Sequence, residues 1–158
     1  MTSLSETLFG GDYPPAGFYF KVSFAATAGM SDTSFLEVSG LTAEMNVEEV
    51  VEGGENRYTH RLPVAVRHPN LVLKRGIAPI TYPLVIWCKA VLEADLALPV
   101  LAQPLVVQLL SETGMPLRAW TLANAYPVKW EVTGFHAQKN EVAIETIELA
   151  YNYSMRLL

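Results

Sequence analysis

The histidines and aspartates are the residues of this chain best suited to catalysis or metal binding. They are His60, His68 and His136, together with Asp12, Asp32 and Asp95. Their spacing matches none of the arrangements that such chemistry uses, since there is no Gly-x-Ser-x-Gly elbow, no His-Glu-x-x-His pair and no glycine-rich phosphate loop. The sequence therefore predicts a protein that is not an enzyme and that holds neither a cofactor nor a metal ion.

Other reactive side chains also fail to form a site. Glu145 and Glu148 are three residues apart on a predicted strand, so their carboxylates face opposite sides and do not act on one substrate. Tyr151 and Tyr153 share a face of that strand, as residues that pack within a sheet do. The single cysteine, Cys88, allows no internal disulfide and is expected to be a small core residue.

Composition narrows the class of protein. A net charge of −5 offers no basic face, which argues against sequence-specific nucleic-acid binding. Charged residues make up only 17%, against about a quarter in typical soluble domains. This shortfall suggests that part of the surface is buried against other chains.

The sequence predicts neither a membrane-spanning helix nor a signal peptide. Its longest apolar region, Ala90 to Leu110, is interrupted by Glu93, Asp95, Pro99 and Pro104, which a membrane helix of about 20 apolar residues would not tolerate. The N-terminal residues lack the basic and apolar segments of a signal peptide. We therefore expect no membrane insertion and assembly in the bacterial cytoplasm.

The first half of the chain predicts strands. Phe18, Phe20, Val22 and Phe24 alternate with polar residues at the strand period. After a turn over Gly29 to Thr33, Phe35 to Val51 is one long strand or two strands joined at Gly40, where a glycine marks a bulge or a close backbone approach. The remaining predictions are a turn over Glu52 to Asn56, a returning strand over Tyr58 to Leu62, a link over Pro63 to Pro69 and a strand over Asn70 to Lys74.

One helix interrupts the strands. Leu84, Trp87, Cys88 and Val91 fall at helical spacing, and Pro83 suits the first helical turn, so a helix is expected over about 82–94. Because its other positions are also apolar, it should be covered on more than one side. Further strands are predicted over Gln103 to Leu110, Leu117 to Ala123, Val128 to Gly134 and Glu141 to Tyr153.

These elements predict a mainly β fold, an antiparallel barrel or sandwich of about eight strands with one flanking helix. The length fits a single domain over 1–158. Within it we expect an N-terminal arm over 1–16, the barrel over 17–153 and a C-terminal tail over 154–158.

Charge is segregated along the predicted hairpin. Five acids and no base lie between Glu44 and Glu55, and five bases and no acid lie between Arg57 and Arg75. One interpretation is that Glu and Arg pair across the two strands. The other is that the acidic hairpin tip meets the basic segment of the next copy, because a head-to-tail contact needs two different complementary patches. The candidate contact residues are Glu48, Glu49, Glu52, Gly53, Gly54, Glu55, Asn56, Arg57, Arg61, Arg67, Lys74 and Arg75.

Several motifs in order resemble the tube proteins of contractile tails. They are EVSGL (37–41), EGGEN (52–56), HRLP (60–63), NLVLKRG (70–76), a helix bearing Trp87, a hairpin ending in Trp120, NAYPVKW (124–130) and NEVAIETIEL (140–149). This family includes the tube proteins of contractile phages and of phage-tail-like extracellular injection particles, and the type VI secretion tube protein Hcp is a structural cousin. The resemblance covers roughly 19–151.

The resemblance implies a structural role. Six protomers close into a hexameric ring, and rings stack into a hollow tube that a contracting sheath drives through a target envelope. The implied partners are further copies, sheath protein, baseplate and spike proteins, a terminator cap, and effector protein or DNA as lumenal cargo. The tube would be found in the released particle or virion tail.

Two departures from the family pattern keep a second role open. The chain has Leu62-Pro63-Val64 and His68-Pro69-Asn70 where relatives often carry Leu-Pro-Gly and then an aromatic residue, and its last residues differ as well. The alternative is a minor ring that initiates the tube at the baseplate. A monomeric ligand-binding β-barrel is a weaker alternative, because it requires more surface charge than the chain has.

Polar alternation gives candidates for the channel lining. Glu44, Asn46 and Glu48 share one strand face, and Lys129, Glu131 and Thr133 share another. A solvated outer face would explain the same pattern.

Overall fold

The computed structural model describes residues 17–27, 29–54, 59–77, 80–95, 97, 99–134 and 143–158. Its strands are β1 (Tyr19–Phe24), β2 (Ser31–Phe35), β3 (Glu37–Ser39), β4 (Glu44–Val50), β5 (His60–Arg67), β6 (Leu71–Gly76), β7 (Gln103–Leu110), β8 (Pro116–Thr133), β9 (Ile144–Ala150) and β10 (Tyr153–Arg156). The helix of the described residues is α2 (Pro83–Leu92). The predicted mainly β, antiparallel fold with a flanking helix is confirmed.

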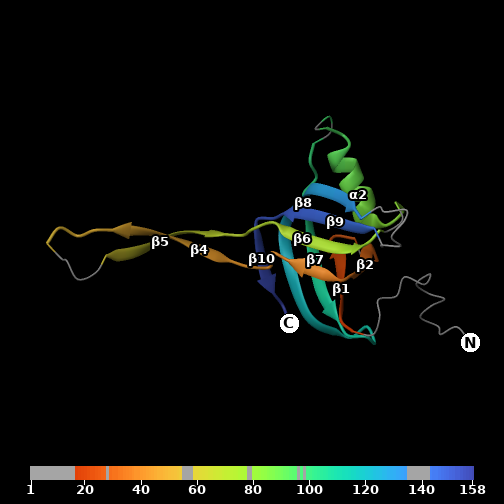
Figure 1. The fold of residues 1–158 in the computed structure, drawn as a ribbon, viewed down its shortest axis with the longest axis horizontal. Coiled ribbons are helices and arrows are strands. Elements are labelled where there is room, and N and C mark those ends of the chain that lie inside the picture. Colours follow the sequence, from red (N-terminus) through yellow and green to blue (C-terminus); the bar gives the residue numbers. More distant parts are fainter. Residues whose placement is uncertain are drawn as a thin grey trace, which may run out of the picture.

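Seven strands form a curled sheet in the order β2-β1-β7-β8-β9-β6-β3. Only Leu36 separates β2, which pairs with β1, from β3, which pairs with β6. The two ends of the sheet are therefore one continuous stretch of chain, and the Leu36 N–H donates to the Lys74 carbonyl at 3.0 Å. The result is a closed barrel, with β10 added alongside the first half of β8 (Figure 1).

Apolar side chains from every wall of the barrel fill its interior. The fully buried residues include Val22, Phe35, Leu71, Leu73, Leu105, Val107, Leu122, Ile147 and Leu149. They alternate along their strands with more exposed residues, as in β6, where positions 71, 73 and 75 face inward. This alternation is the period-two pattern that the sequence predicted.

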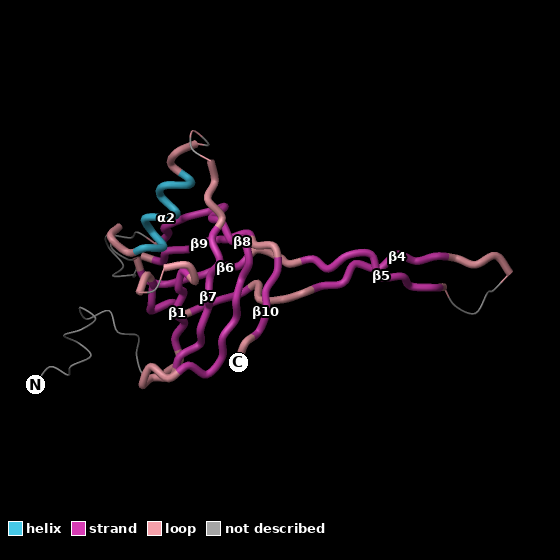
Figure 2. Tube along the Cα trace, turned by 180° about the vertical axis from the view of Figure 1, so that it is seen from behind, coloured by secondary structure: helices cyan, strands magenta, loops and turns pink. Residues whose placement is uncertain are grey.

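The helix covers one end of the barrel (Figure 2). Pro83 occupies its first turn, as predicted, and Leu84, Val85 and Cys88 are buried. Burial raises the pKa of the Cys88 thiol to about 12, which fits an unreactive core residue. Ile86 is 51% exposed, so the prediction that the helix is covered on more than one side is wrong for the single protomer.

Two strand predictions were wrong in the first half of the chain. Ser31–Phe35, which was predicted partly as a turn, forms the strand β2. Its sequence lacks the usual apolar alternation because the buried residue at position 32 is an aspartate. The chain from 63 to 67, predicted as a link, continues β5. Of the two alternatives predicted for Phe35 to Val51, the structure has the one divided at Gly40, since β3 ends at Ser39 and β4 begins at Glu44.

The C-terminal half also differs from the prediction. The strands expected at Leu117 to Ala123 and Val128 to Gly134 are one 18-residue strand, β8, bent where Asn124 has a φ of 52°. The last predicted strand is instead β9 and β10, with a bend after Ala150. Tyr151 is therefore 7% exposed and Tyr153 56% exposed, so they do not share a face, and most of the expected tail belongs to β10.

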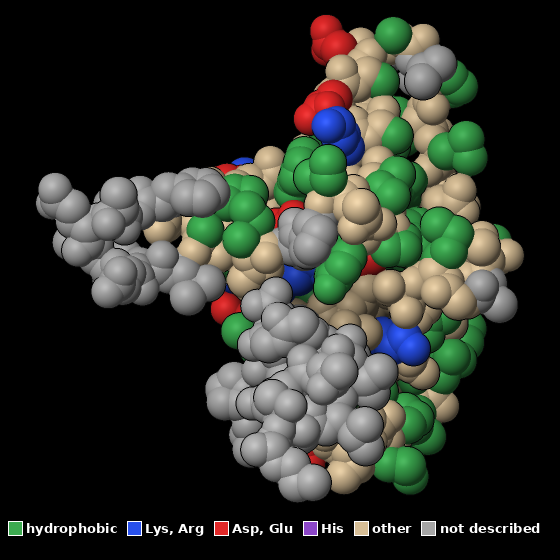
Figure 3. Space-filling view, turned by 90° about the vertical axis from the view of Figure 1, so that its right-hand side faces the viewer, with side chains coloured by type: hydrophobic (Ala, Val, Ile, Leu, Met, Phe, Trp, Pro, Cys, Tyr) green, Lys and Arg blue, Asp and Glu red, His purple; other side chains and the backbone are tan. Residues whose placement is uncertain are grey.

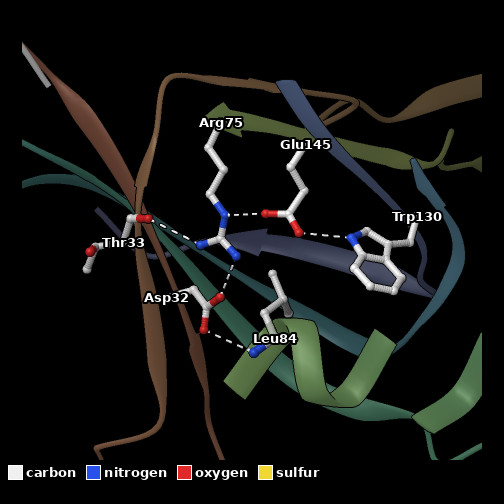
Figure 4. Close-up of polar contacts among 6 residues, drawn as sticks. All are labelled: Asp32, Thr33, Arg75, Leu84, Trp130 and Glu145. Carbon is white, nitrogen blue, oxygen red and sulfur yellow. Dashed lines mark hydrogen bonds and ion pairs between the residues drawn. The ribbon is translucent and has the colours of Figure 1, made fainter. Parts of the chain in front are cut away.

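A buried ionic cluster joins the elements that close the barrel (Figure 4). The guanidinium of Arg75 on β6 donates from Nη2 to Asp32 Oδ2 on β2 and from Nε to Glu145 Oε2 on β9, both at 2.8 Å. It also lies 4.3 Å from the ring centroid of Phe35. All three charged side chains are almost inaccessible, at 2% or less.

The remaining carboxylate oxygens of the cluster are paired as well. Asp32 Oδ1 accepts the backbone N–H of Leu84 at 3.0 Å, and Glu145 Oε1 accepts Trp130 Nε1–H at 2.8 Å. Burial raises the pKa of the Asp32 carboxyl, and the N–H groups of Leu84 and Arg75 oppose that rise. The cluster thereby fixes the start of α2 against β2, β6 and β9.

Replacing Arg75 should cost a large part of the stability of the protomer. Arg75→Met leaves two buried carboxylates without their cation, and we expect a loss of about 3–5 kcal/mol in the free energy of unfolding. Urea denaturation followed by circular dichroism measures this loss.

Lys74→Met provides the matched control on the same strand. Lys74 is half exposed and lies 3.9 Å from Glu37, so its loss should cost about 1 kcal/mol or less. Equal effects of the two substitutions would contradict the role of the cluster.

Candidate assembly surface

The β4–β5 hairpin projects from the barrel as a long arm (Figures 1 and 2). We call residues 44–67 the arm. Every residue of β4 is exposed, as is every residue of β5 except His60. Within the described residues, the substantial contacts of β4 and β5 are with each other. A two-stranded hairpin of this kind is marginal in water on its own.

The strand register divides the arm into two faces. Glu44, Asn46 and Glu48 lie on one face, with Arg67, Ala65 and Leu62 opposite them. Met45 and Val47 lie on the other face, opposite Val66 and Pro63. Val64 has no partner on β4 and forms a bulge between these pairs.

The second face is apolar near the base of the arm and is exposed in the part of the chain that the structure describes. We define this apolar face by Met45, Val47, Pro63 and Val66. Met45 is 53%, Val47 43% and Val66 54% exposed. Contiguous exposed apolar side chains of this kind mark an interaction surface. These residues were missing from the predicted contact set, although the alternation of Met45 and Val47 with Glu44, Asn46 and Glu48 could have identified them.

The charges of the arm lie opposite each other in register. Glu44 faces Arg67 and Glu49 faces Arg61, but neither couple closes to an ion pair within 4.0 Å. Glu52 and His60 form a closer contact, with Glu52 Oε2 3.2 Å from His60 Nε2. The register places Glu and Arg opposite each other, as the cross-strand interpretation expects. Both couples are nevertheless exposed, so a second molecule can also reach their charges.

Other predicted contact residues lie elsewhere. Arg75 is buried in the ionic cluster, and this burial is incompatible with its predicted place in an exposed basic segment. Lys74 lies on the barrel and pairs with Glu37. Gly53 and Gly54 form the turn that follows β4. Glu55, Asn56 and Arg57 lie outside the described residues.

The predicted channel-lining residues lie on two separate surfaces. Glu44, Asn46 and Glu48 are on the polar face of the arm. Lys129, Glu131 and Thr133 are on the outer side of the barrel wall, opposite the side of Trp130 that meets Glu145. Lys129 Nζ and Glu131 Oε2 are 2.8 Å apart. Their assignment to a channel stays a prediction.

The strand β10 carries a second uncovered apolar row, which the sequence interpretation missed. Tyr153, Met155 and Leu157 are each 56–57% exposed. Along its ladder β10 pairs with β8, and no other described strand pairs with its outer edge. The alternation of these residues with Ser154 and Arg156 could have revealed the strand.

The described residues offer little for other kinds of site. They contain no group of three or more potential metal ligands, and none of their helices is long and apolar enough to cross a membrane. His60 begins β5 and His68 lies at the base of the arm. A shallow groove of about 450 Å³ lies along α2, lined by Ile86, Lys89, Ala90, Glu93 and Ala94. Viewed from the side away from the arm, charged side chains gather at the end where α2 lies (Figure 3).

Comparisons with known proteins were made for the whole chain. The family model of the T4-like virus tail tube protein gp19 matches residues 16–155. No curated protein matches the chain significantly.

Solved structures show the same fold. A chain of the anti-feeding prophage (AFP) baseplate is 31% identical, with 91% of this chain and 94% of that chain covered and a TM-score of 0.74. A chain of the PVC sheath-tube complex in the extended state is 21% identical over 99% of each chain, with a TM-score of 0.67. Hcp1 from Salmonella typhimurium is 11% identical over 89% of this chain and 85% of that chain, with a TM-score of 0.54.

The family is a structural component of tails, so the prediction that the chain is not an enzyme is confirmed by its relatives. A closed barrel with a projecting arm and a match over residues 16–155 lead to one identification: the chain belongs to the T4-like tail tube protein family, the tube proteins of contractile injection systems.

Proposed function

We propose that this chain is the repeating subunit of a hollow tube, in which six copies close into a ring and rings stack head to tail. The apolar face of the arm carries the proposal, because it is exposed on a protomer whose barrel is otherwise closed. A second copy of the chain covers this face in the assembly. Six copies agree with the 6-fold symmetry applied to the AFP baseplate structure that holds the 31% identical chain.

The tube conducts cargo passively in this proposal. A contracting sheath drives it through a target envelope, and effector protein or DNA passes along the lumen. Its other partners are the sheath, the baseplate and spike, and a terminator cap, and it leaves the cell in the finished particle. The related structures come from a baseplate, a cap and a sheath-tube complex, which supports this set of partners.

A charge placed on the apolar face should stop assembly. Met45→Glu buries an unpaired carboxylate in the contact, which costs about 3 kcal/mol or more, a factor of about a hundred in the association constant. The protomer should stay folded, because Met45 is exposed. Negative-stain electron microscopy and native mass spectrometry compare the assemblies.

Asn46→Glu is the matched control, because it adds the same charge to the neighbouring residue on the opposite face of the arm. We expect it to leave rings intact. Normal tubes from the Met45→Glu protein would refute a buried contact at the apolar face.

We further propose that the arm's charges stack one ring on the next, through Arg61 and Arg67 and the acids Glu44, Glu48, Glu49 and Glu52. Arg61→Glu should then block tube growth and leave single rings. Because Arg61 faces Glu49 within the arm, the swap Arg61→Glu with Glu49→Arg restores that couple but leaves Glu44, Glu48 and Glu52 unchanged. Stacking of Arg61 on one of these three acids of the next copy predicts that the swap stays defective, as measured by tube length in electron micrographs. Restored tubes would instead show that the partner of Arg61 is Glu49 and would overturn stacking on the other acids.

A minor ring that initiates the tube at the baseplate is the second candidate function. The observation that favours it is the 31% identity to a chain in a baseplate structure, against 21% to a chain in a sheath-tube complex. Quantitative mass spectrometry of purified particles separates the two roles. One ring of copies per particle indicates an initiator, and a copy number that grows with particle length indicates the shaft.

A further inference from the structure

Both legs of the arm leave the barrel at one point. The first leg follows β3 through Gly40 to β4, and the second leg joins β5 to β6 through His68 and Asn70. The two strands that receive them, β3 and β6, are paired at Ser39 and Val72. Because, among the described residues, the strands of the arm have their substantial contacts with each other, the direction of the arm is set at this base.

Gly40 brings the two legs into backbone contact. Its φ is +94°, and a Cβ atom at this position would lie 2.1 Å from the Asn70 carbonyl oxygen and 2.9 Å from its carbonyl carbon. Only glycine fits both the conformation and the space. The predicted close backbone approach at Gly40 is thus confirmed, and it lies at the base of the arm.

Two side chains also contact carbonyl groups of the first leg. The hydroxyl of Tyr151 donates to the Gly40 carbonyl at 2.7 Å, and Nδ1 of His68 lies 3.2 Å from the Thr42 carbonyl. The rings of His68 and Tyr151 are in contact, with centroids 5.5 Å apart. Tyr151 itself is 7% exposed and packs in the core cluster, so the arm is connected to the rigid interior.

Small rotations at this base become large displacements along the arm. The seven residues of β4 extend about 23 Å, so a rotation of about 10° moves the far end by about 4 Å, close to the spacing of neighbouring strands. A contact that pairs or interdigitates side chains does not tolerate such a shift.

We propose that Gly40, His68 and Tyr151 are positioning residues that fix the angle of the arm on the barrel, and thereby the register in which the arm meets a second copy. This inference rests on the proposed function for its partner. The claim about the angle concerns the single protomer and is tested separately.

Tyr151→Phe is the variant of choice because it removes the hydroxyl and keeps the ring. Tyr153→Phe removes an exposed tyrosine hydroxyl two residues away and is the control. Because Tyr151→Phe loses one hydrogen bond of ordinary strength, the fraction of protomers whose arm departs from its normal angle should rise roughly fivefold.

Spin labels at Leu62→Cys on the arm and Ala90→Cys on α2 report the angle. Both positions are exposed, whereas the native Cys88 is buried with its pKa raised to about 12, so it does not take up label. Doubly labelled protein is diluted into excess unlabelled protein, so that only distances within one protomer are recorded. Thermal unfolding confirms that each variant is folded, and electron microscopy records rings and tubes.

We expect Tyr151→Phe to broaden the distance distribution and to reduce tubes in favour of rings, whereas the distance distribution of Tyr153→Phe should be that of the parent protein. An unchanged distribution would overturn the positioning role, and a broadened distribution with normal tubes would overturn its link to register. If the parent protein itself forms neither rings nor tubes, the proposed function fails, and the distance measurement still decides whether these residues set the arm.

Discussion

The burial of Arg75 between two carboxylates is the constraint on which the barrel depends. A charged side chain is rarely buried, and this one is satisfied only when β2 supplies Asp32 and β9 supplies Glu145. A slip of β6 by one residue would turn Arg75 to the outside and leave the two acids inside without a cation. Because Asp32 also accepts the Leu84 N–H, the same cluster sets where α2 begins. Register, closure and helix position thus follow from one set of contacts.

Closure of the barrel decides where the molecule is incomplete. With β2 and β3 continuous, the main sheet closes on itself, and among the described residues the arm and the outer side of β10 present strand edges that no other strand pairs with. Both places also carry exposed apolar side chains, such as Met45 and Met155. Edge groups and apolar surface coincide in these two segments, which is the distribution expected of surfaces that another copy covers.

Much of the fold could be predicted from the sequence, because period-two alternation and the helical spacing of Leu84, Trp87 and Cys88 are local signals. What failed was non-local. Asp32 made β2 resemble a turn, since its burial depends on Arg75, which is distant in the chain. The charge pattern grouped Arg75 with Arg61 and Arg67 in an exposed basic segment, although Arg75 lies on the inward face of β6 and is buried. Likewise, Tyr151 and Tyr153 obey the strand period in sequence but are separated by a bend after β9 that no local residue pattern indicates.

An exposed arm poses a problem before assembly, because free strand edges pair indiscriminately. Three features of this arm oppose that pairing. Pro63 has no N–H to offer, the bulge at Val64 interrupts the regular ladder, and the Glu and Arg couples add charge along both strands. A partner must therefore match a bulged ladder, an apolar face and a fixed charge order at once. Only a surface shaped for all three gains by binding, and in the proposed assembly that surface is a second copy presented at the angle set by the base of the arm. The devices that keep the single protomer from aggregating are then the same ones that make its assembly selective.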